Sequence, residues 1–315
     1  MVRFLIRKVP SVVFVLFTGS IVAFALPRLA PGNVAVSLAG PDPTAANIAA
    51  IRQQLGLDRP LMVQYWNWIS GLFRGDLGQS YLLHRSVASV IGDRLESTVE
   101  LAVLSTLLVI AIGTVLGVLA GSSGRRWARA VLDLTNSLFI AVPSFLIGVL
   151  LILVFGVLNR WLPVNGEVGF LHDPAVGIQF LILPAFALAL SPAATVARLL
   201  QTEMRAAGNE EYVDLARSKG ASAARITVRH VLRNSVGTAV VAVGLQIGNL
   251  LAGAIVIEAI FNRNGLGQLV VSSVQTRDFT VLQVLIVGAV FVAVACQILT
   301  EIVLAALDPR IKLGD

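Results

Sequence analysis

Long apolar runs alternate with short polar segments along almost the whole chain. Six runs have, or nearly have, the roughly 20 apolar residues that a helix needs to cross a bilayer. They are Val9–Leu26, Leu101–Ala120, Leu138–Leu158, Ile178–Leu200, Val236–Ile260 and Thr280–Leu304. Because a helix satisfies its own backbone hydrogen bonds in lipid, the pattern predicts an all-α polytopic membrane protein with six transmembrane helices.

The first run has a second interpretation, because it could be a secretory signal peptide. Arg3, Arg7 and Lys8 precede the run, and Ala23-Phe24-Ala25 near its end resembles a cleavage site. The run is longer than the core of a typical signal peptide, which has about 7–15 apolar residues. We therefore expect it to be retained as a transmembrane helix.

The distribution of Lys and Arg predicts the orientation of the spans. With the N-terminus inside, the inner segments carry 15 basic residues and the two short outer loops carry three. Basic residues favour the cytoplasmic side in short loops, while long segments weigh little. The pattern predicts a multi-pass membrane protein with both termini in the cytoplasm.

A polar segment, Arg28–Glu96, separates the first two runs. Asp42-Pro43-Thr44 and Gly56 mark the ends of one short helix, and Asp58-Arg59-Pro60 precedes another at Leu61–Phe73. Tyr65, Trp66 and Trp68 in the second helix are typical of the membrane–water interface. Such a helix either shapes the outer mouth of a transporter or simply holds the segment at the surface.

The same pattern divides the chain into three regions. Residues 1–27 are expected to form an N-terminal transmembrane helix, and residues 28–96 an extracytoplasmic segment with interfacial helices. Residues 97–310 are expected to form the core transmembrane domain, with a cytoplasmic loop at residues 201–235.

Small and helix-breaking residues within the runs predict how the helices pack. Gly113, Gly117 and Gly121 recur every four residues, as do Gly244 and Gly248, so each set lies on one helix face and allows close packing. Three prolines, Pro143, Pro184 and Pro192, favour kinks.

Polar residues inside the apolar runs are candidates for a solute path. Gln246 and Asn249 lie in the fifth run and Gln283 in the sixth. Such residues are costly in lipid and often functional. Hydrogen bonds between helices are the alternative explanation for their presence. Glu258 and Glu301 lie near opposite ends of the same two runs.

One polar and basic stretch, Glu211–Asn234, interrupts the apolar pattern between the fourth and fifth runs. Residues Glu210–Lys219 read as a helix, Gly220-Ala221 as a turn, and Ser222 as the cap of a second helix that ends near Arg233. The second helix repeats arginine at positions 225, 229 and 233, which requires anions opposite. Lipid phosphates could supply them, but a glycine turn between two short helices is better suited to docking against an acidic protein surface.

Composition supports a membrane protein and excludes several kinds of chemistry. Apolar residues make up 56% and charged residues 13% of the chain, against about 25% charged residues in soluble domains. The net charge of +6 lies mostly between apolar runs, so topology explains it better than nucleic-acid binding. Cys296 is the single cysteine, and His84, His172 and His230 are isolated, so the sequence predicts neither an internal disulfide nor a metal site. The chain has no phosphate-binding loop and is not expected to hydrolyse ATP.

The basic stretch resembles the cytoplasmic coupling loop of the permease subunits of ABC importers. The broad signature is E-A-A, three residues, Gly, nine residues and I-x-L-P; this chain has Asp214-Leu215-Ala216, Gly220 and His230–Arg233. It departs at the Glu, the first Ala, the Ile and the Pro. The local form is similar to the dipeptide/oligopeptide branch of that family. The matching residues are Glu211, Tyr212, Ala216, Arg217, Lys219, Gly220, Arg229, His230, Leu232 and Asn234.

Two other regions resemble the first permease of the same branch. The outer segment has Leu55–Leu61, then Gln64-Tyr65, Arg74–Gly78 and Ser80. The last outer loop has Glu258, Phe261, Gly265-Leu266-Gly267 and Arg277-Asp278-Phe279, with Asn264 where the family usually has proline. The resemblance extends over nearly the whole chain.

The resemblance implies a fold, a function and partners. The fold would be that of type I ABC importers. The chain would be a permease in the cytoplasmic membrane of a prokaryote that translocates peptides or similar small solutes. The implied partners are a second homologous permease, two ABC ATPase subunits that bind ATP and Mg, an extracytoplasmic substrate-binding protein and membrane lipids. No cofactor is expected in this chain. The residues implied in coupling to the ATPase are Glu211, Tyr212, Asp214, Ala216, Arg217, Lys219, Gly220, Arg229 and His230.

Two other functions remain open from the residues alone. A gradient-driven secondary transporter would need acidic ion-binding residues at mid-membrane or an inverted repeat, and the sequence shows neither. A membrane enzyme could use Glu258 or Asp278 as an acid or base, but no second convergent group accompanies either residue.

Overall fold

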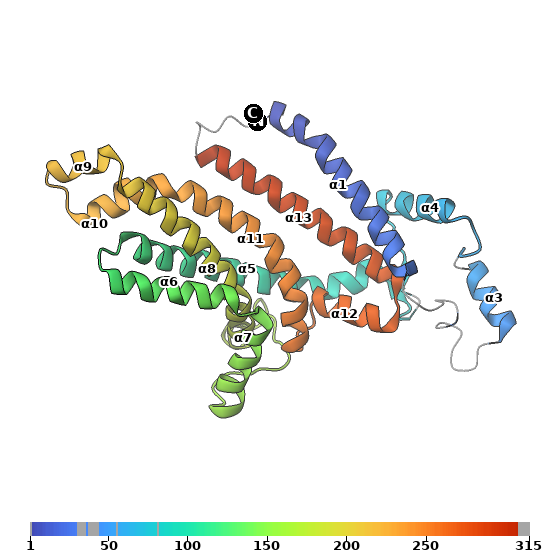
Figure 1. Ribbon diagram of the computed structural model, residues 1–315. Coiled ribbons are helices and arrows are strands. Elements are labelled where there is room, and N and C mark those ends of the chain that lie inside the picture. Colours follow the sequence, from blue (N-terminus) through green and yellow to red (C-terminus); the bar gives the residue numbers. More distant parts are fainter. Residues whose placement is uncertain (1, 30–35, 37–43, 55, 81, 308–315) are drawn as a thin grey trace.

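The computed structural model describes residues 2–29, 36, 44–54, 56–80 and 82–307, and the chain forms an elongated bundle of long helices (Figure 1). Within these described residues, five helices are long and apolar enough to cross a membrane, and up to six do so if a bent pair of helices forms one span. The long helices are α1 (Val2–Leu29), α5 (Val87–Ser122), α8 (Pro174–Gly208), α11 (Arg233–Ile260) and α13 (Phe279–Leu307). The prediction of an all-α membrane protein is confirmed.

Helices α5 and α8 pack closely because glycines line one face of α5. A Cβ at Gly113 or Gly117 would lie 3.0 Å from the carbonyl oxygen of Ala193 or Ala197, and one at Gly121 would lie 2.8 Å from the Met204 Cβ. The predicted glycine face is therefore a helix interface. In the fifth span, Gly244 packs against Thr300 of α13, whereas Gly248 faces open space.

The third predicted span is not one continuous helix. α6 (Arg126–Ala141) ends before Pro143, and α7 (Ser144–Leu151) continues through a π-helical turn, η1 (Ile152–Leu158), at 98° to α6. The kink predicted at Pro143 is confirmed, and it divides the predicted Leu138–Leu158 run between the end of α6 and the α7–η1 segment. Proline lacks an N–H donor and disfavours the helical conformation of the residue before it, and Val142 is extended. Pro184 and Pro192, by contrast, lie inside the continuous helix α8.

The segment between α1 and α5 contains two described helices, α3 (Ala45–Gln54) and α4 (Leu61–Phe73). The bounds of α4 are those predicted from the sequence. Gly56 has a φ of +64°, as a glycine ending α3 permits, while Asp42 and Pro43 lie outside the described residues. Tyr65 and Trp68 of α4 pack on Phe24 of α1, and Trp66 is exposed.

A short hairpin leads into α5. Strand β1 (Gln79–Ser80) pairs antiparallel with β2 (Arg85–Ser86), with Gln79 opposite Ser86. The Ser86 hydroxyl then accepts a hydrogen bond from the Ser89 backbone N–H and caps α5. The helix thus begins well before the predicted second span and runs through position 97, where the sequence suggests that the core begins.

Two smaller helical units lie at opposite ends of the bundle (Figure 1). At one end, α9 (Glu211–Ser218), α10 (Ala223–Arg225) and the π-helical η2 (Ile226–Leu232) form a knob. At the far end, α12 (Leu266–Thr276) joins α11 to α13. Residues Ala223–Ile260 form one helical span of 38 residues, so a single continuous element connects the knob to the far end.

Candidate functional site

The knob contains the first helix and the glycine turn predicted from the sequence, but the second helix does not end near Arg233 as predicted and continues into α11. Lys219 and Ala221 donate backbone hydrogen bonds to the carbonyl oxygens of Leu215 and Ala216, each at 3.1 Å, and close α9. Gly220 has a φ of +79°, which favours glycine. The Ser222 hydroxyl accepts from the Arg225 backbone N–H at 3.4 Å and caps the second helix. The local sequence therefore forms the turn that it predicts.

The knob is held firmly on the bundle by its apolar side. Val213 is fully buried in a cluster with Leu200, Met204, Ile226 and Val231. Tyr212 also accepts a hydrogen bond from the Asn234 amide of α11, at 3.1 Å between nitrogen and oxygen. A force applied to α9 would therefore reach α8 and α11 directly.

The other side of the knob presents charge and exposed apolar groups. Leu215 and Val228 are more than half exposed, and Arg217 pairs with Asp214 at 2.9 Å on the surface. Exposed ion pairs add little to stability, so these groups are free to exchange partners. This combination suits a protein-docking surface.

The nine residues implied in coupling fall into an exposed group and a half-buried group. The exposed ones are Glu211, Tyr212, Asp214, Arg217, Lys219, Gly220 and Arg229. Ala216 and His230 are half-buried, and Ala216 packs against the Val213 cluster. The described structure thus places seven of the nine residues where a partner could touch them, and their role in docking stays a prediction.

The three candidate path residues are not equivalent. Asn249 is exposed on α11 and donates a hydrogen bond to the half-buried Gln246 at 2.8 Å. Gln283 of α13 is buried, with 6% of its surface exposed. Of the three candidates, only Gln246 and Asn249 have substantial exposed surface in this structure, and a role in a solute path stays a prediction.

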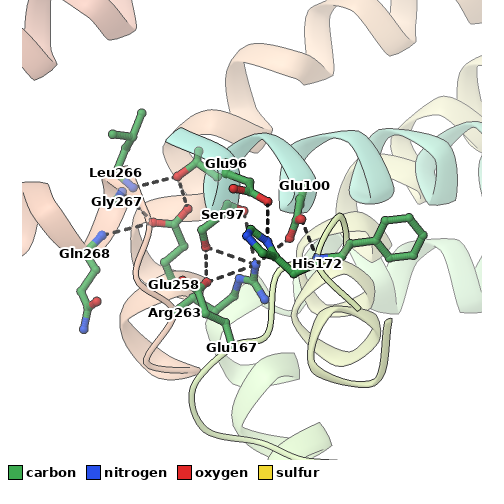
Figure 2. Close-up of polar contacts among 12 residues, drawn as sticks. Glu96, Ser97, Glu100, Glu167, His172, Glu258, Arg263, Leu266, Gly267 and Gln268 are labelled. Carbon is green, nitrogen blue, oxygen red and sulfur yellow. Dashed lines mark hydrogen bonds and ion pairs between the residues drawn. The ribbon is translucent and has the colours of Figure 1, made fainter. Parts of the chain in front are cut away.

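At the far end, one buried carboxylate joins three helices. Glu258 of α11 has no exposed surface. Its Oε2 accepts backbone hydrogen bonds from Gly267 and Gln268 of α12, at 2.7 and 3.2 Å, and its Oε1 accepts from the Thr98 hydroxyl of α5 at 2.7 Å. Figure 2 shows Glu258 pointing toward the first turn of α12.

A buried arginine lies beside this carboxylate (Figure 2). Arg263, which is 1% exposed, places Nη2 at 3.4 Å from Glu167 Oε2 and 3.7 Å from Glu100 Oε2. The same nitrogen donates to the Ser97 hydroxyl at 3.1 Å. Burial lowers the pKa of Arg263, and the Glu167 and Glu100 carboxylates oppose that shift. Arginine stays protonated in proteins, so the cluster contains a buried positive charge.

The geometry does not support acid or base catalysis by Glu258 or Asp278. Asp278 is 7% exposed and accepts hydrogen bonds from the Ser80 hydroxyl and the Val281 backbone N–H. Both carboxylates are thus committed to structural donors and are closed to a substrate. Within the described ranges, no group of three or more His, Cys, Asp or Glu residues could hold a metal ion.

The sequence indicates Glu258 as a candidate residue but does not indicate which side chains surround it. Thr98, Ser97, Glu100 and Glu167 lie far from Glu258 and Arg263 in the sequence, and folding brings them together. One signal was available, because Glu96 and Glu100 immediately precede the second apolar run, where charge is costly.

Two protein families match the chain, and between them they cover it almost completely. Residues 113–313 match the family described as "Binding-protein-dependent transport system inner membrane component". Residues 1–102 match the N-terminal component of the same transport systems.

Curated relatives match end to end. A putative peptide transport system permease protein of Brucella abortus strain 2308 is 34% identical over 312 residues, covering 99% of each chain. The glutathione transport system permease protein GsiC of Escherichia coli K12 is also 34% identical over 312 residues, with 99% of each chain covered. Among solved structures, a chain of the MetNI methionine ABC transporter in an inward-facing conformation superposes with a TM-score of 0.58. That match covers 70% of this chain and 96% of the other at 17% identity, and shows the shared fold.

Proposed function

The chain belongs to the family of inner membrane components of binding-protein-dependent transport systems, and on that premise we propose how it works and what it carries. It is a permease subunit of an ABC importer. We propose that it conducts peptides or related small solutes, including glutathione-like tripeptides, because relatives named for peptide and glutathione transport match it over 99% of its length. The knob end faces the cytoplasm and the α12 end faces outward, as the basic residues favour.

The observation that supports this mechanism is the continuous helix Ala223–Ile260. Its first turns belong to the knob, and its last turn contains Glu258 at the far end. ATP binding to two partner ATPases closes them, and the knob, seated on one ATPase, transmits that movement along the helix. A second homologous permease completes the solute path, and the Gln246–Asn249 pair lines part of it.

The partners follow from the same proposal. ATP and Mg bind on the ATPase subunits, and this chain contributes no cofactor site. An extracytoplasmic binding protein delivers the solute to the α12 end. The exposed charges and apolar groups of the knob, including Leu215 and Arg217, contact the ATPase.

The test is purification of the tagged chain from its own membrane in mild detergent, followed by identification of the proteins that accompany it. We expect a second permease and ATP-binding subunits, which are lost when the exposed knob residues Glu211, Arg217 and Lys219 are all changed to alanine. A matched control changes Arg125 and Arg126, the N-cap and the first residue of α6, at the same end of the bundle. Recovery of the chain alone, or as a homo-oligomer, under several detergents would contradict the proposal.

The solute is identified with the reconstituted complex. Vesicles are supplied with ATP inside and with the associated binding protein plus labelled dipeptides, longer peptides or glutathione outside. We expect ATP-dependent uptake of at least one of these solutes. Uptake without ATP, driven by an ion gradient, would instead favour a secondary transporter.

A further inference from the structure

We propose that Thr98 and Glu258 form, with the first turn of α12, a latch that holds the outer end of the permease closed and releases during each transport cycle. This inference rests on the proposed function. Thr98 and Glu258 act as positioning residues and do not contact the solute. The latch is defined as Thr98, Glu258, Leu266, Gly267 and Gln268.

The latch provides hydrogen-bond acceptors for three backbone N–H groups at the start of α12 that have no partner within the helix. The first N–H groups of a helix have no partner within it. Here Gly267 and Gln268 donate to the Glu258 carboxylate, and Leu266 donates to the Thr98 hydroxyl at 2.7 Å. Because the same hydroxyl donates to Glu258, removing Thr98 Oγ1 breaks two links at once. A carboxylate at a helix N-terminus is also favoured by the helix dipole.

The neighbouring charges are poorly suited to a permanent seal. Arg263 is buried, yet its Nε and Nη1 have no hydrogen-bond partner in the structure. Its ion pairs with Glu167 and Glu100 are long, at 3.4 and 3.7 Å. Replacing a buried ion pair with well-packed apolar residues of similar volume is often neutral or stabilising, so stability alone does not require charges here. A buried charge cluster with unused donors is better suited to a contact that has two arrangements.

The connection to the knob gives the latch a source of movement. The Ala223–Ile260 helix spans roughly 55 Å at about 1.5 Å per residue, from the knob to the turn that contains Glu258. Only residues 261–265 separate this helix from α12. Asn262 in this short link and Arg277 after α12 both have positive φ, at 50° and 59°. A rotation of α11 must therefore carry α12 with it or break the hydrogen bonds to Glu258.

The test compares ATP hydrolysis by the complete complex with and without its binding protein. Thr98→Val keeps the shape of the side chain and removes the hydroxyl, while Thr98→Ser retains it. Thr106→Val is a matched control, because the Thr106 hydroxyl on the same helix bonds only to the Ala102 carbonyl in the structure. We expect Thr98→Val to raise the rate without binding protein by about three- to tenfold, the factor expected for one or two lost hydrogen bonds. Solute uptake per ATP should fall, and both controls should behave as wild type.

A second measurement uses the complex without any substitution in the latch. Spin labels at the exposed positions Leu95 of α5 and Val274 of α12 report their separation without nucleotide and after trapping with ATP and vanadate. We expect the distance distribution to change on trapping. An unchanged distribution, or a Thr98→Val complex with wild-type hydrolysis and stimulation, would overturn the latch. Either result leaves wild-type ATP-driven uptake intact, whereas failure of the proposed function would appear as absence of that uptake in the wild-type complex.

Discussion

The carboxylate of Glu258 occupies the space that a side chain at Gly265 would need. A Cβ at position 265 would lie 2.3 Å from the Glu258 carboxyl carbon, and the three hydrogen bonds to this carboxylate prevent it from moving aside cheaply. At Gly267, a Cβ would lie 2.4 Å from the Cα of Ile255. The Gly265-Leu266-Gly267 sequence is therefore required by close packing between α11 and the start of α12.

This packing predicts that Gly267→Ala destabilises the protein. Its added methyl group meets backbone atoms of α11, and overpacking of this kind costs about 1–3 kcal/mol. We expect a lower midpoint of thermal unfolding in detergent. Gly248→Ala is the matched control, since no atom lies within 4 Å of a Cβ there. Equal midpoints for the two variants would contradict the packing of α12 described above.

Because α1 and α13 are in contact, we predict that an engineered disulfide can join them. A Cβ at Gly19 would lie 3.5 Å from the Cβ of Val290, at the short end of the roughly 3.5–4.5 Å range found in disulfides. With Cys296 replaced by serine, we expect Gly19→Cys/Val290→Cys to become resistant to maleimide labelling after mild oxidation and sensitive again after reduction.

The control for this disulfide pairs Gly19→Cys with Val292→Cys on the same helix. Val292 is exposed and lies two residues farther along α13, on another face of the helix. This pair should remain labelled under oxidising conditions. If both pairs or neither became protected, α1 would not pack on α13 as the structure shows.

The hydrogen bond between Ser80 and Asp278 predicts a loss of stability in Ser80→Ala. Both residues are buried, and the Ser80 hydroxyl donates to Asp278 Oδ2 while accepting from the Leu83 backbone N–H. A buried acceptor that loses its donor costs about 1–3 kcal/mol. Thermal unfolding should show a clear decrease relative to Ser70→Ala, because the Ser70 hydroxyl bonds only locally to Asn67 on an exposed surface. An effect no larger than that control would show that this contact does not hold β1 against the start of α13.

Substitutions at Gly220 should affect docking to the ATPase without preventing the chain from folding. No atom lies within 4 Å of a Cβ at this position, but φ is +79°. Gly220→Trp should therefore block association with the ATPase while the detergent-purified chain still folds. Gly220→Asn tests backbone strain alone, since asparagine tolerates this conformation better than most residues, and we expect only partial loss of ATPase recovery.

Gly124→Trp provides the control for bulk at the same end of the bundle, because position 124 is also open. The measurement is the amount of ATPase that co-purifies with each variant, alongside the elution volume of the chain. Undiminished recovery with Gly220→Trp would exclude this turn from the docking surface.

Local residues allow the knob and α4 to be predicted from the sequence. Gly220 permits the positive φ, Ser222 supplies a capping oxygen, and Pro60 precedes the first residue of α4. Each signal acts within a few residues of the structure that it determines. The long apolar runs likewise predict membrane helices, because backbone groups in lipid must be satisfied within the segment itself.

The tertiary structure alone decided how distant residues meet. The sequence predicts a kink at Pro143 but not its 98° angle, which depends on what packs around α6 and α7. Nothing local to Thr98 indicates that its hydroxyl meets Glu258, 160 positions away, or that Arg263 is buried between Glu100 and Glu167. Gln283 reads as a path residue from its place in an apolar run, yet packing buries it. Short-range signals determine where helices begin and end, whereas side-chain pairing across helices depends on the packing of the whole bundle.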